Sequence, residues 1–441
     1  MKKGIVGKVL LVLAMAFMLV GCGDSTEEKG SVYYLNFKPE VASVWEEIAQ
    51  VYTEETGVEV KINTAASGNY EKILQSEVAK REIPTLFQIN GPIGYKEWQE
   101  FCLDLSDTDL YAHLLDKNLA ITVDGGVYGI PYVVEGYGII YNDAIMKKYF
   151  ALPDKAVAIS SADEITSFEL LKAVAEDMTL HKEQLGIKGV FASTSMAAGE
   201  DWRWQTHTAN LPVYYEYQDK GVTDLAEIEF TYSDNMKNIM DLYLNNSCVE
   251  PALTGSKTVS DSMAEFALGK VAMVQNGNWA WGQIAGVEGN TVAEEDVKFM
   301  PIYTGVAGEE TQGLCIGTEN FFAINSQASE ADQKAAIDFV NWLVSSATGK
   351  DYMVNKLGNT APFTTFTDDE KPTDPLAKSM LASMESGKTA VAWSFTTFPS
   401  QTFKDNYGAA LLEYANGNMT WDDVKALVVE EWAVEKAAIA E

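Results

Sequence analysis

The apolar residues in the first third of the chain follow strand and helix spacings in turn. Residues 31–37 (SVYYLNF) read as a buried strand, residues 41–53 place apolar side chains at helical spacing, and residues 58–62 alternate as a second strand. Gly57 predicts the end of the intervening helix. Strand, helix and strand in this order predict a right-handed unit with parallel strands. Helix and strand patterns repeat over residues 70–89, so this third is predicted to form a doubly wound α/β lobe.

Strand patterns return in the rest of the chain, between longer helical stretches and loops. Short strands are predicted at residues 127–132, 138–141, 271–274 and 321–324, and a helix with one apolar face at residues 331–345. The length of 441 residues exceeds what one hydrophobic core usually supports. The chain is therefore predicted to form two α/β lobes.

The first thirty residues indicate export and lipid anchoring. Three lysines precede an unbroken apolar run, Val9–Val20, which is too short to span a bilayer. Leu19-Val20-Gly21-Cys22 resembles the lipobox of bacterial lipoproteins, in which the cysteine is acylated and becomes the first mature residue. We expect a signal peptide over residues 1–21 and a lipidated flexible tether over residues 22–30. This predicts a protein held at the extracellular face of the cell membrane through lipid, such as palmitate, on Cys22.

Charge and cysteine content exclude several kinds of partner. The formal net charge of -32 makes electrostatic binding to nucleic acid or anionic lipid unfavourable. The four cysteines have no C-x-x-C spacing and only three histidines accompany them, so no metal site is predicted. Once Cys22 is acylated, Cys102, Cys248 and Cys315 allow at most one disulfide.

Motifs of common enzyme active sites are absent from the sequence. It contains no H-E-x-x-H, G-x-S-x-G or G-x-G-x-x-G. Ser386-Gly387-Lys388-Thr389 lacks the earlier glycine of a phosphate-binding loop, since that position is Ala382, and residues 376–384 read instead as a helix that stops at Gly387. Adjacent acids such as Glu46-Glu47 cannot face each other across a glycosidic bond. We therefore predict no catalytic residue, no cofactor and a role in binding.

The segment Asn276-Gly277-Asn278-Trp279-Ala280-Trp281 has the composition of a sugar site. It follows the predicted strand 271–274 and places two tryptophans beside amides in a loop that contains glycine. Sugars combine apolar C–H faces with a ring of hydroxyls, so their sites pair aromatic rings with carboxylates and amides. Trp279, Trp281 and Asn278 are therefore candidate ligand residues, although either tryptophan could instead pack in the core.

Several segments resemble the family 1 extracellular solute-binding proteins, which bind sugars for ABC importers. Phe266 to Met273 (FALGKVAM) followed by Asn276 to Trp279 carries the resemblance, together with residues 126–132 (GVYGIPY), Tyr141-Asn142 and residues 338–343 (DFVNWL). With the lipobox, the resemblance covers nearly the whole chain. It implies a monomer with a type II periplasmic-binding-protein-like fold, in which a hinge joins two lobes around a ligand cleft. The lobes are expected at residues 31–136 plus 317–374 and at residues 137–316 plus 375–441.

The resemblance also implies roles for single residues. Trp279 matches the aromatic residue that stacks on a sugar ring in the maltose-binding members, and Glu135 matches a carboxylate that accepts hydrogen bonds from hydroxyls. Lys38 occupies the loop where a charged side chain meets the ligand, although Asn36-Phe37-Lys38-Pro39 differs from the maltose-binding pattern. Tyr137 lies beside Glu135 in the expected hinge, and Trp393 lies near a further cleft aromatic of those members.

Four more candidates come from their positions in the pattern. Trp202 and Trp204 alternate in Asp201-Trp202-Arg203-Trp204-Gln205-Thr206-His207, which predicts either a stacking platform or a wedge buried under a loop. Asn90 ends the strand near residues 83–89, and Tyr70 follows the second strand. Ligands of open α/β sheets bind outside the carboxyl ends of the strands, so both are candidates.

The sequence leaves three functions open. A lipoprotein that captures an oligosaccharide, such as a maltooligosaccharide, and delivers it to an ABC permease is favoured by the aromatic and amide clusters. A surface-anchored glycoside hydrolase would require Glu135 to find a second carboxylate across the cleft. A binding protein for a polyamine, a peptide or an oxyanion would keep the transport role with other cargo.

Replacing the lipobox cysteine tests the anchor. The Cys22→Ser variant is expected to leave the membrane fraction, because it removes the only predicted site of acylation. Cell fractionation with a fatty-acid label measures this directly. Retention of the unlabelled variant in the membrane fraction would show that another segment anchors the chain.

Overall fold

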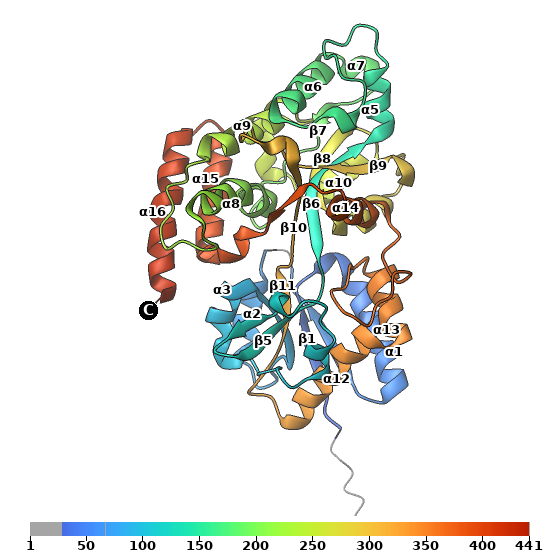
Figure 1. Cartoon of the computed structure of the whole chain (residues 1–441), viewed down its shortest axis with the longest axis vertical. Coiled ribbons are helices and arrows are strands. Elements are labelled where there is room, and N and C mark those ends of the chain that lie inside the picture. The colour runs from blue at the N-terminus through green and yellow to red at the C-terminus, as the bar shows by residue number, and fades with distance from the viewer. Residues whose placement is uncertain (1–28, 67, 441) are drawn as a thin grey trace, which may run out of the picture.

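Two six-stranded β-sheets organise the chain, and each has its own helices and hydrophobic core (Figure 1). The computed structural model describes residues 29–66 and 68–440. The predicted signal peptide, Cys22 and the tether up to residue 28 lie outside the described residues. The two-lobed α/β architecture predicted from the sequence is confirmed.

The first sheet has the strand order β2-β1-β3-β11-β5-β4. Its strands are β1 (Val32–Asn36), β2 (Val60–Thr64), β3 (Leu86–Asn90), β4 (Ile121–Val123), β5 (Gly126–Pro131) and β11 (Asn320–Ile324). β1 pairs in parallel with β2 and β3, whereas β11 runs antiparallel between β3 and β5. Because β11 comes late in the chain, the first lobe is built from two separate parts of the sequence.

The predicted parallel unit at the start of this lobe is also confirmed. β1 and β2 pair in parallel with Val32 opposite Val60, and α1 (Ala42–Thr56) connects them. α1 ends at Gly57, whose φ of 72° is a left-handed conformation that glycine adopts without steric cost.

The helices of the first lobe cover its sheet and form its core. They are α1, α2 (Tyr70–Val78), α3 (Gly91–Trp98), α4 (Asp109–Ala112), α12 (Glu330–Ser345) and α13 (Ala347–Asp351). Tyr52 of α1 and Phe339 of α12 meet edge to face with their ring centroids 4.9 Å apart. Trp45 of α1 is fully buried beside Tyr34 of β1. The apolar face predicted for residues 331–345 therefore packs into this core, as expected.

The second sheet has the strand order β12-β10-β6-β8-β7, and β9 also pairs with β6. Its strands are β6 (Glu135–Asn142), β7 (Gly189–Phe191), β8 (Val271–Gly277), β9 (Val297–Met300), β10 (Gln312–Gly317) and β12 (Thr389–Ala392). β7 is parallel to β8 and β12 is parallel to β10, whereas β6 is antiparallel to β8, β9 and β10. Both sheets thus add antiparallel strands to the parallel ones that the pattern predicts.

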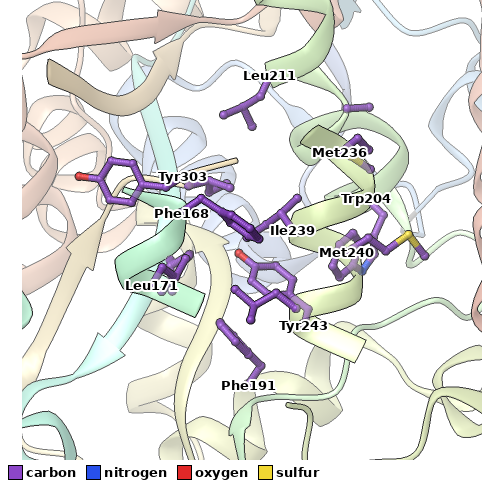
Figure 2. Packing of buried hydrophobic residues seen from close by; sticks show 14 of the residues in the cluster. Phe168, Leu171, Phe191, Trp204, Leu211, Met236, Ile239, Met240, Tyr243 and Tyr303 are labelled. Atoms are coloured by element: carbon purple, nitrogen blue, oxygen red, sulfur yellow. The ribbon is translucent and has the colours of Figure 1, made fainter. Parts of the chain in front are cut away.

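Helices surround the second sheet and build the larger core. They are α5 (Asp143–Phe150), α6 (Phe168–Leu180), α7 (Lys182–Leu185), α8 (Asn210–Lys220), α9 (Ser233–Asn245), α10 (Val259–Ala267), α11 (Trp281–Ala285), α14 (Pro375–Glu385), α15 (Gln401–Ala415) and α16 (Trp421–Ala440). Figure 2 shows Ile239 and Tyr243 of α9 packed among Phe168, Phe191 and Trp204. α14 ends before Gly387, as predicted for the residues after 376.

The chain passes between the two lobes at three places. It leaves β5 at Pro131 and enters β6 at Glu135, and it returns from β10 to β11 between Gly317 and Asn320. The third passage lies between α13 and α14. β6 and β10 pair antiparallel at the first two passages, with Glu135 opposite Gly317. This pairing fixes Glu135 at the junction of the lobes.

Two further observations concern the cysteines and the membrane. Cys102, Cys248 and Cys315 are free thiols, so the structure has no disulfide among them. Within residues 29–66 and 68–440, none of the helices combines the length and the apolar character needed to cross a bilayer.

Candidate functional site

A cavity of about 500 Å³ lies between the two lobes, and both lobes contribute to its wall. The first lobe contributes residues 37–40, residues near the start of α2, Asn90 and Asn320. The second lobe contributes residues 199–202 and 205–207, the start of α10, Trp279, Gln283 and the start of α15. Glu135 and Glu319 line it at the passages between the lobes. The shape of the cavity therefore depends on the relative positions of the two lobes.

The architecture of the first sheet explains the position of its lining residues. Lys38 follows the carboxyl end of β1, and Asn90 is the last residue of β3. Tyr70 begins α2 after β2, and its hydroxyl accepts a hydrogen bond from the backbone N–H of Gln88 (2.7 Å). Because parallel strands end at the same edge of a sheet, these residues converge on one site.

Lys38 and Glu135 form a buried ion pair at the base of the cavity. Asn36 positions Lys38, since its side chain accepts from the Lys38 N–H (3.1 Å) and donates to the Lys38 carbonyl (2.8 Å). Burial opposes the charge on Lys38, but the carboxylates of Glu135, Glu40 and Glu319 together outweigh it, and the pKa of Lys38 is raised. The ammonium also lies 5.4 Å from the ring centroid of Trp279. The ammonium of Lys38, a residue of the first lobe, thus contacts Glu135 on β6 and Trp279 of the second lobe.

The second lobe supplies an aromatic wall. The rings of Trp202 and Trp279 have centroids 6.2 Å apart, and His207 lies against both. The Arg203 guanidinium packs over the Trp202 ring at 4.0 Å. Both tryptophans are half-buried and line the cavity. They therefore present ring surface against which an apolar face of a ligand can pack.

Burial perturbs several ionisable groups in the wall. It raises the pKa of Asp201 and of Glu71 to about 7, in Glu71 against an opposing hydrogen bond from Trp98 Nε1. The pKa of Glu319 is raised by the same cause, and the pKa of Lys404 is lowered by it. These groups lose hydration in the enclosed cavity.

Polar atoms without a partner also occur in this wall. Within the described residues, Asn320 Oδ1, His207 Nδ1 and Gln283 Oε1 have no hydrogen-bond partner. Asn320 is only 1% exposed, so leaving its acceptor unpaired costs about 1–3 kcal/mol. A ligand that supplies donors would remove this cost.

The lobes touch at the mouth of the cavity. Gly68 of the first lobe lies so close to Gly199 of the second that an added Cβ would be 2.7 Å from Gly199 Cα. Lys72 Nζ reaches Asp405 Oδ2 across the same gap at 3.7 Å. These contacts bring the two lobes together beside the cavity.

The structure brings six of the predicted site residues to the cavity wall. They are Lys38, Tyr70, Asn90, Glu135, Trp202 and Trp279. Trp204 lies in the core of the second lobe, 2% exposed, with its ring edge to face with Tyr243 (Figure 2). Trp281 packs in another apolar cluster of that lobe. Residues two apart in a helical segment point to different sides, which separates Trp202 from Trp204 and Trp279 from Trp281.

The other three predicted residues lie behind the wall. Asn278 Oδ1 accepts a hydrogen bond from the Gly136 N–H (2.9 Å) and so ties β6 to the segment after β8. Tyr137 stacks on His207 at 4.2 Å, and Trp393 lies next to Tyr137 at 5.7 Å. Each supports a lining residue or passage strand instead of lining the cavity itself.

Sequence reasoning missed several residues of the wall. The main ones are Glu40, Glu71, Asp201, His207, Glu319 and Lys404. Asp201 and His207 were visible only as neighbours of tryptophans, and Lys404 lies on a helix with no distinguishing pattern. Glu319 was detectable in principle, because it follows a predicted passage between the lobes.

The ion pair at the base of the cavity can be tested by removing its cation. The Lys38→Met variant is expected to lose about 3–5 kcal/mol of unfolding free energy, because Glu135 is left buried without a partner. Urea unfolding measures the loss. Lys61→Met is the matched control, since its ion pair with Glu82 is exposed and contributes at most about 1 kcal/mol. Equal losses of unfolding free energy in the two variants would show that the pair of Lys38 and Glu135 stabilises the fold no more than an exposed ion pair does.

The comparisons with known proteins agree with this architecture. A family model described as bacterial extracellular solute-binding protein matches residues 47–379. A chitin oligosaccharide binding protein superposes with a TM-score of 0.72 at 17% identity, covering 94% of this chain and 100% of that one. RafE in complex with raffinose gives 0.67 at 16% identity, with 92% and 99% covered, and maltose-bound MalE3 of T. maritima gives 0.66 at 15%, with the same coverage. The resemblance inferred from the sequence is confirmed, and the chain belongs to the bacterial extracellular solute-binding proteins.

Proposed function

We propose that this protein captures an oligosaccharide in the cavity between its lobes and delivers it to an ABC import permease. The observation that carries the proposal is the composition of the wall, in which Trp202 and Trp279 stand with amide and carboxylate groups around an enclosed space. A volume of about 500 Å³ falls within the range of small-ligand sites.

The chemistry of a sugar ring suits this wall. Its C–H faces can pack against Trp279 and Trp202, while its hydroxyls donate to Glu135, Glu319 and the unpaired Asn320 Oδ1. Asn90 lies beside this set and already donates to Glu319 (2.9 Å). The side chains thus offer both kinds of contact that an oligosaccharide requires.

Similar proteins support the same class of ligand. The solved structures with this fold include proteins described as binding chitin oligosaccharide, raffinose and maltose. Sequence identity with them is low, so they support the class and leave the identity of the sugar to experiment.

Capture works by closure of the lobes. The first lobe comprises residues 31–136 plus 317–374, the second comprises residues 137–316 plus 375–441, and the passages between them act as the hinge. A ligand that contacts both lobes binds the closed state more tightly than the open one and so shifts the equilibrium towards closure. The contact of Gly68 with Gly199 is the edge where the closed lobes meet. No covalent step is needed, so the protein is not an enzyme.

Anchoring and delivery complete the role. Acylated Cys22 holds the monomer at the extracellular face of the membrane, and the closed form docks on the permease. The Ser31 N–H donates to Asp332 Oδ1 (2.7 Å) at the start of α12, so the described residues begin on the first lobe, at the end away from the second (Figure 1). A tether from this point leaves the cavity free to receive ligand.

A solute array tests the proposed function. Oligosaccharides are expected to raise the melting temperature, because a ligand that binds only the folded state stabilises it. Calorimetry on the best oligosaccharide is then expected to show a loss of affinity of about tenfold or more in Trp279→Ala, which removes ring surface from the cavity.

Trp281→Ala is the matched control for this experiment. Trp281 is two residues away, packs partly buried against an apolar cluster and does not line the cavity, so its variant is expected to keep the affinity within about twofold while losing stability. Binding of spermidine or peptides with no response to any sugar would overturn the proposed ligand class.

A further inference from the structure

The charge of the cavity wall is strongly unbalanced. Seven carboxylates line it against three lysines. Two of the lysines already have partners, since Lys38 pairs with Glu135 and Lys72 lies 3.7 Å from Asp405. Two cations, the Lys404 amine and the buried Arg203 guanidinium that packs over Trp202, are then left for five carboxylates. These are Glu40, Glu71, Glu200, Asp201 and Glu319.

Neutral groups provide hydrogen bonds to three of these five carboxylates. Glu71 accepts from Trp98 Nε1 (2.9 Å), Glu319 from Asn90 Nδ2 (2.9 Å) and Glu200 from the Val259 N–H (3.0 Å). Glu40 and Asp201 form no ion pair with any described residue. The wall therefore has more negative charge than the surrounding side chains balance.

Burial in the cavity wall disfavours the ionised form of several of these carboxylates. Burial raises the pKa of Asp201 and Glu71 to about 7 and also raises the pKa of Glu319. Lys404 opposes the shift at Glu71 and at Glu319, but the loss of water outweighs its attraction. A cation bound in the cavity would favour their ionised forms.

Unpaired hydrogen-bond acceptors are a second, independent sign that the cavity wall lacks donors. Asn320 lines the cavity, is 1% exposed, and has an Oδ1 without a donor among the described residues. Gln283 Oε1 is likewise unpaired there. An ammonium group offers three donors and no acceptor, so it matches a wall of carboxylates and amide oxygens better than a hydroxyl does.

We infer that the ligand is an amino sugar oligosaccharide whose free amines are protonated. This inference rests on the proposed function and refines its substrate class. The ring faces pack on Trp202 and Trp279, and the ammonium groups pair with carboxylates from both lobes, among them Glu40 of the first and Asp201 of the second. Binding the cation from both sides draws the lobes together.

Matched trisaccharides test the inference by calorimetry. The probes are the β-1,4-linked trimers of glucosamine, N-acetylglucosamine and glucose, with spermidine as a cation that lacks rings. The glucosamine trimer is expected to bind at least tenfold more tightly than both neutral trimers, and its advantage is expected to shrink in high salt.

Isosteric variants locate the interaction. Glu40→Gln and Asp201→Asn are each expected to weaken binding of the glucosamine trimer about tenfold or more. Glu47→Gln, an exposed position on α1, is the control for loss of one negative charge and is expected to leave the affinity unchanged. Glu40 is exposed to solvent in the structure, so its variant is expected to fold even where Asp201→Asn does not.

The outcomes separate this inference from the proposed function. Neutral trimers that bind as tightly as the glucosamine trimer, or a glucosamine trimer that does not bind, overturn the inference. The proposed function survives this result wherever a neutral oligosaccharide binds. Tight binding of spermidine without binding of any saccharide overturns both.

Discussion

The buried ion pair of Lys38 and Glu135 joins the first lobe to the strand that leads into the second. Removing two charges from water costs several kcal/mol per ion, and their attraction offsets this only while both partners stay in place. Asn36 fixes the lysine, and the pairing of β6 with β10 fixes the carboxylate opposite Gly317. The base of the cavity is therefore set by the same contacts that hold the passages between the lobes.

The two lobes contribute different kinds of side chains to the cavity. The first lobe and the passages supply mainly polar groups at strand ends, whereas the second supplies the rings of Trp202 and Trp279. A ligand must contact both sets to satisfy the unpaired acceptors and cover the rings. In the proposed function, ligand binding and closure are coupled, because the contacts with both lobes form only when the lobes have met.

Single strands and helices could be predicted from the sequence because the spacing of apolar residues that identifies each one lies within one short segment. The strand, helix and strand at residues 31–62 show their periods within single segments, and Gly57 marks a helix end by its own chemistry. The cavity wall was harder to predict, since Glu319, Asp201 and Lys404 meet there only through the fold. Trp204 and Trp281 resembled ligand residues, but helical turns place Trp204 in the core and Trp281 partly buried outside the cavity, while Trp202 and Trp279 line it.

The proposed function requires that one chain hold one intact oligosaccharide in the cavity between its lobes. Native mass spectrometry of the protein, after prolonged incubation with a binding oligosaccharide, tests this most directly. We predict a single added mass equal to that of the unmodified oligosaccharide, and no shorter products in solution. Shortened saccharides that accumulate with time, or an absence of any one-to-one complex, would contradict the account.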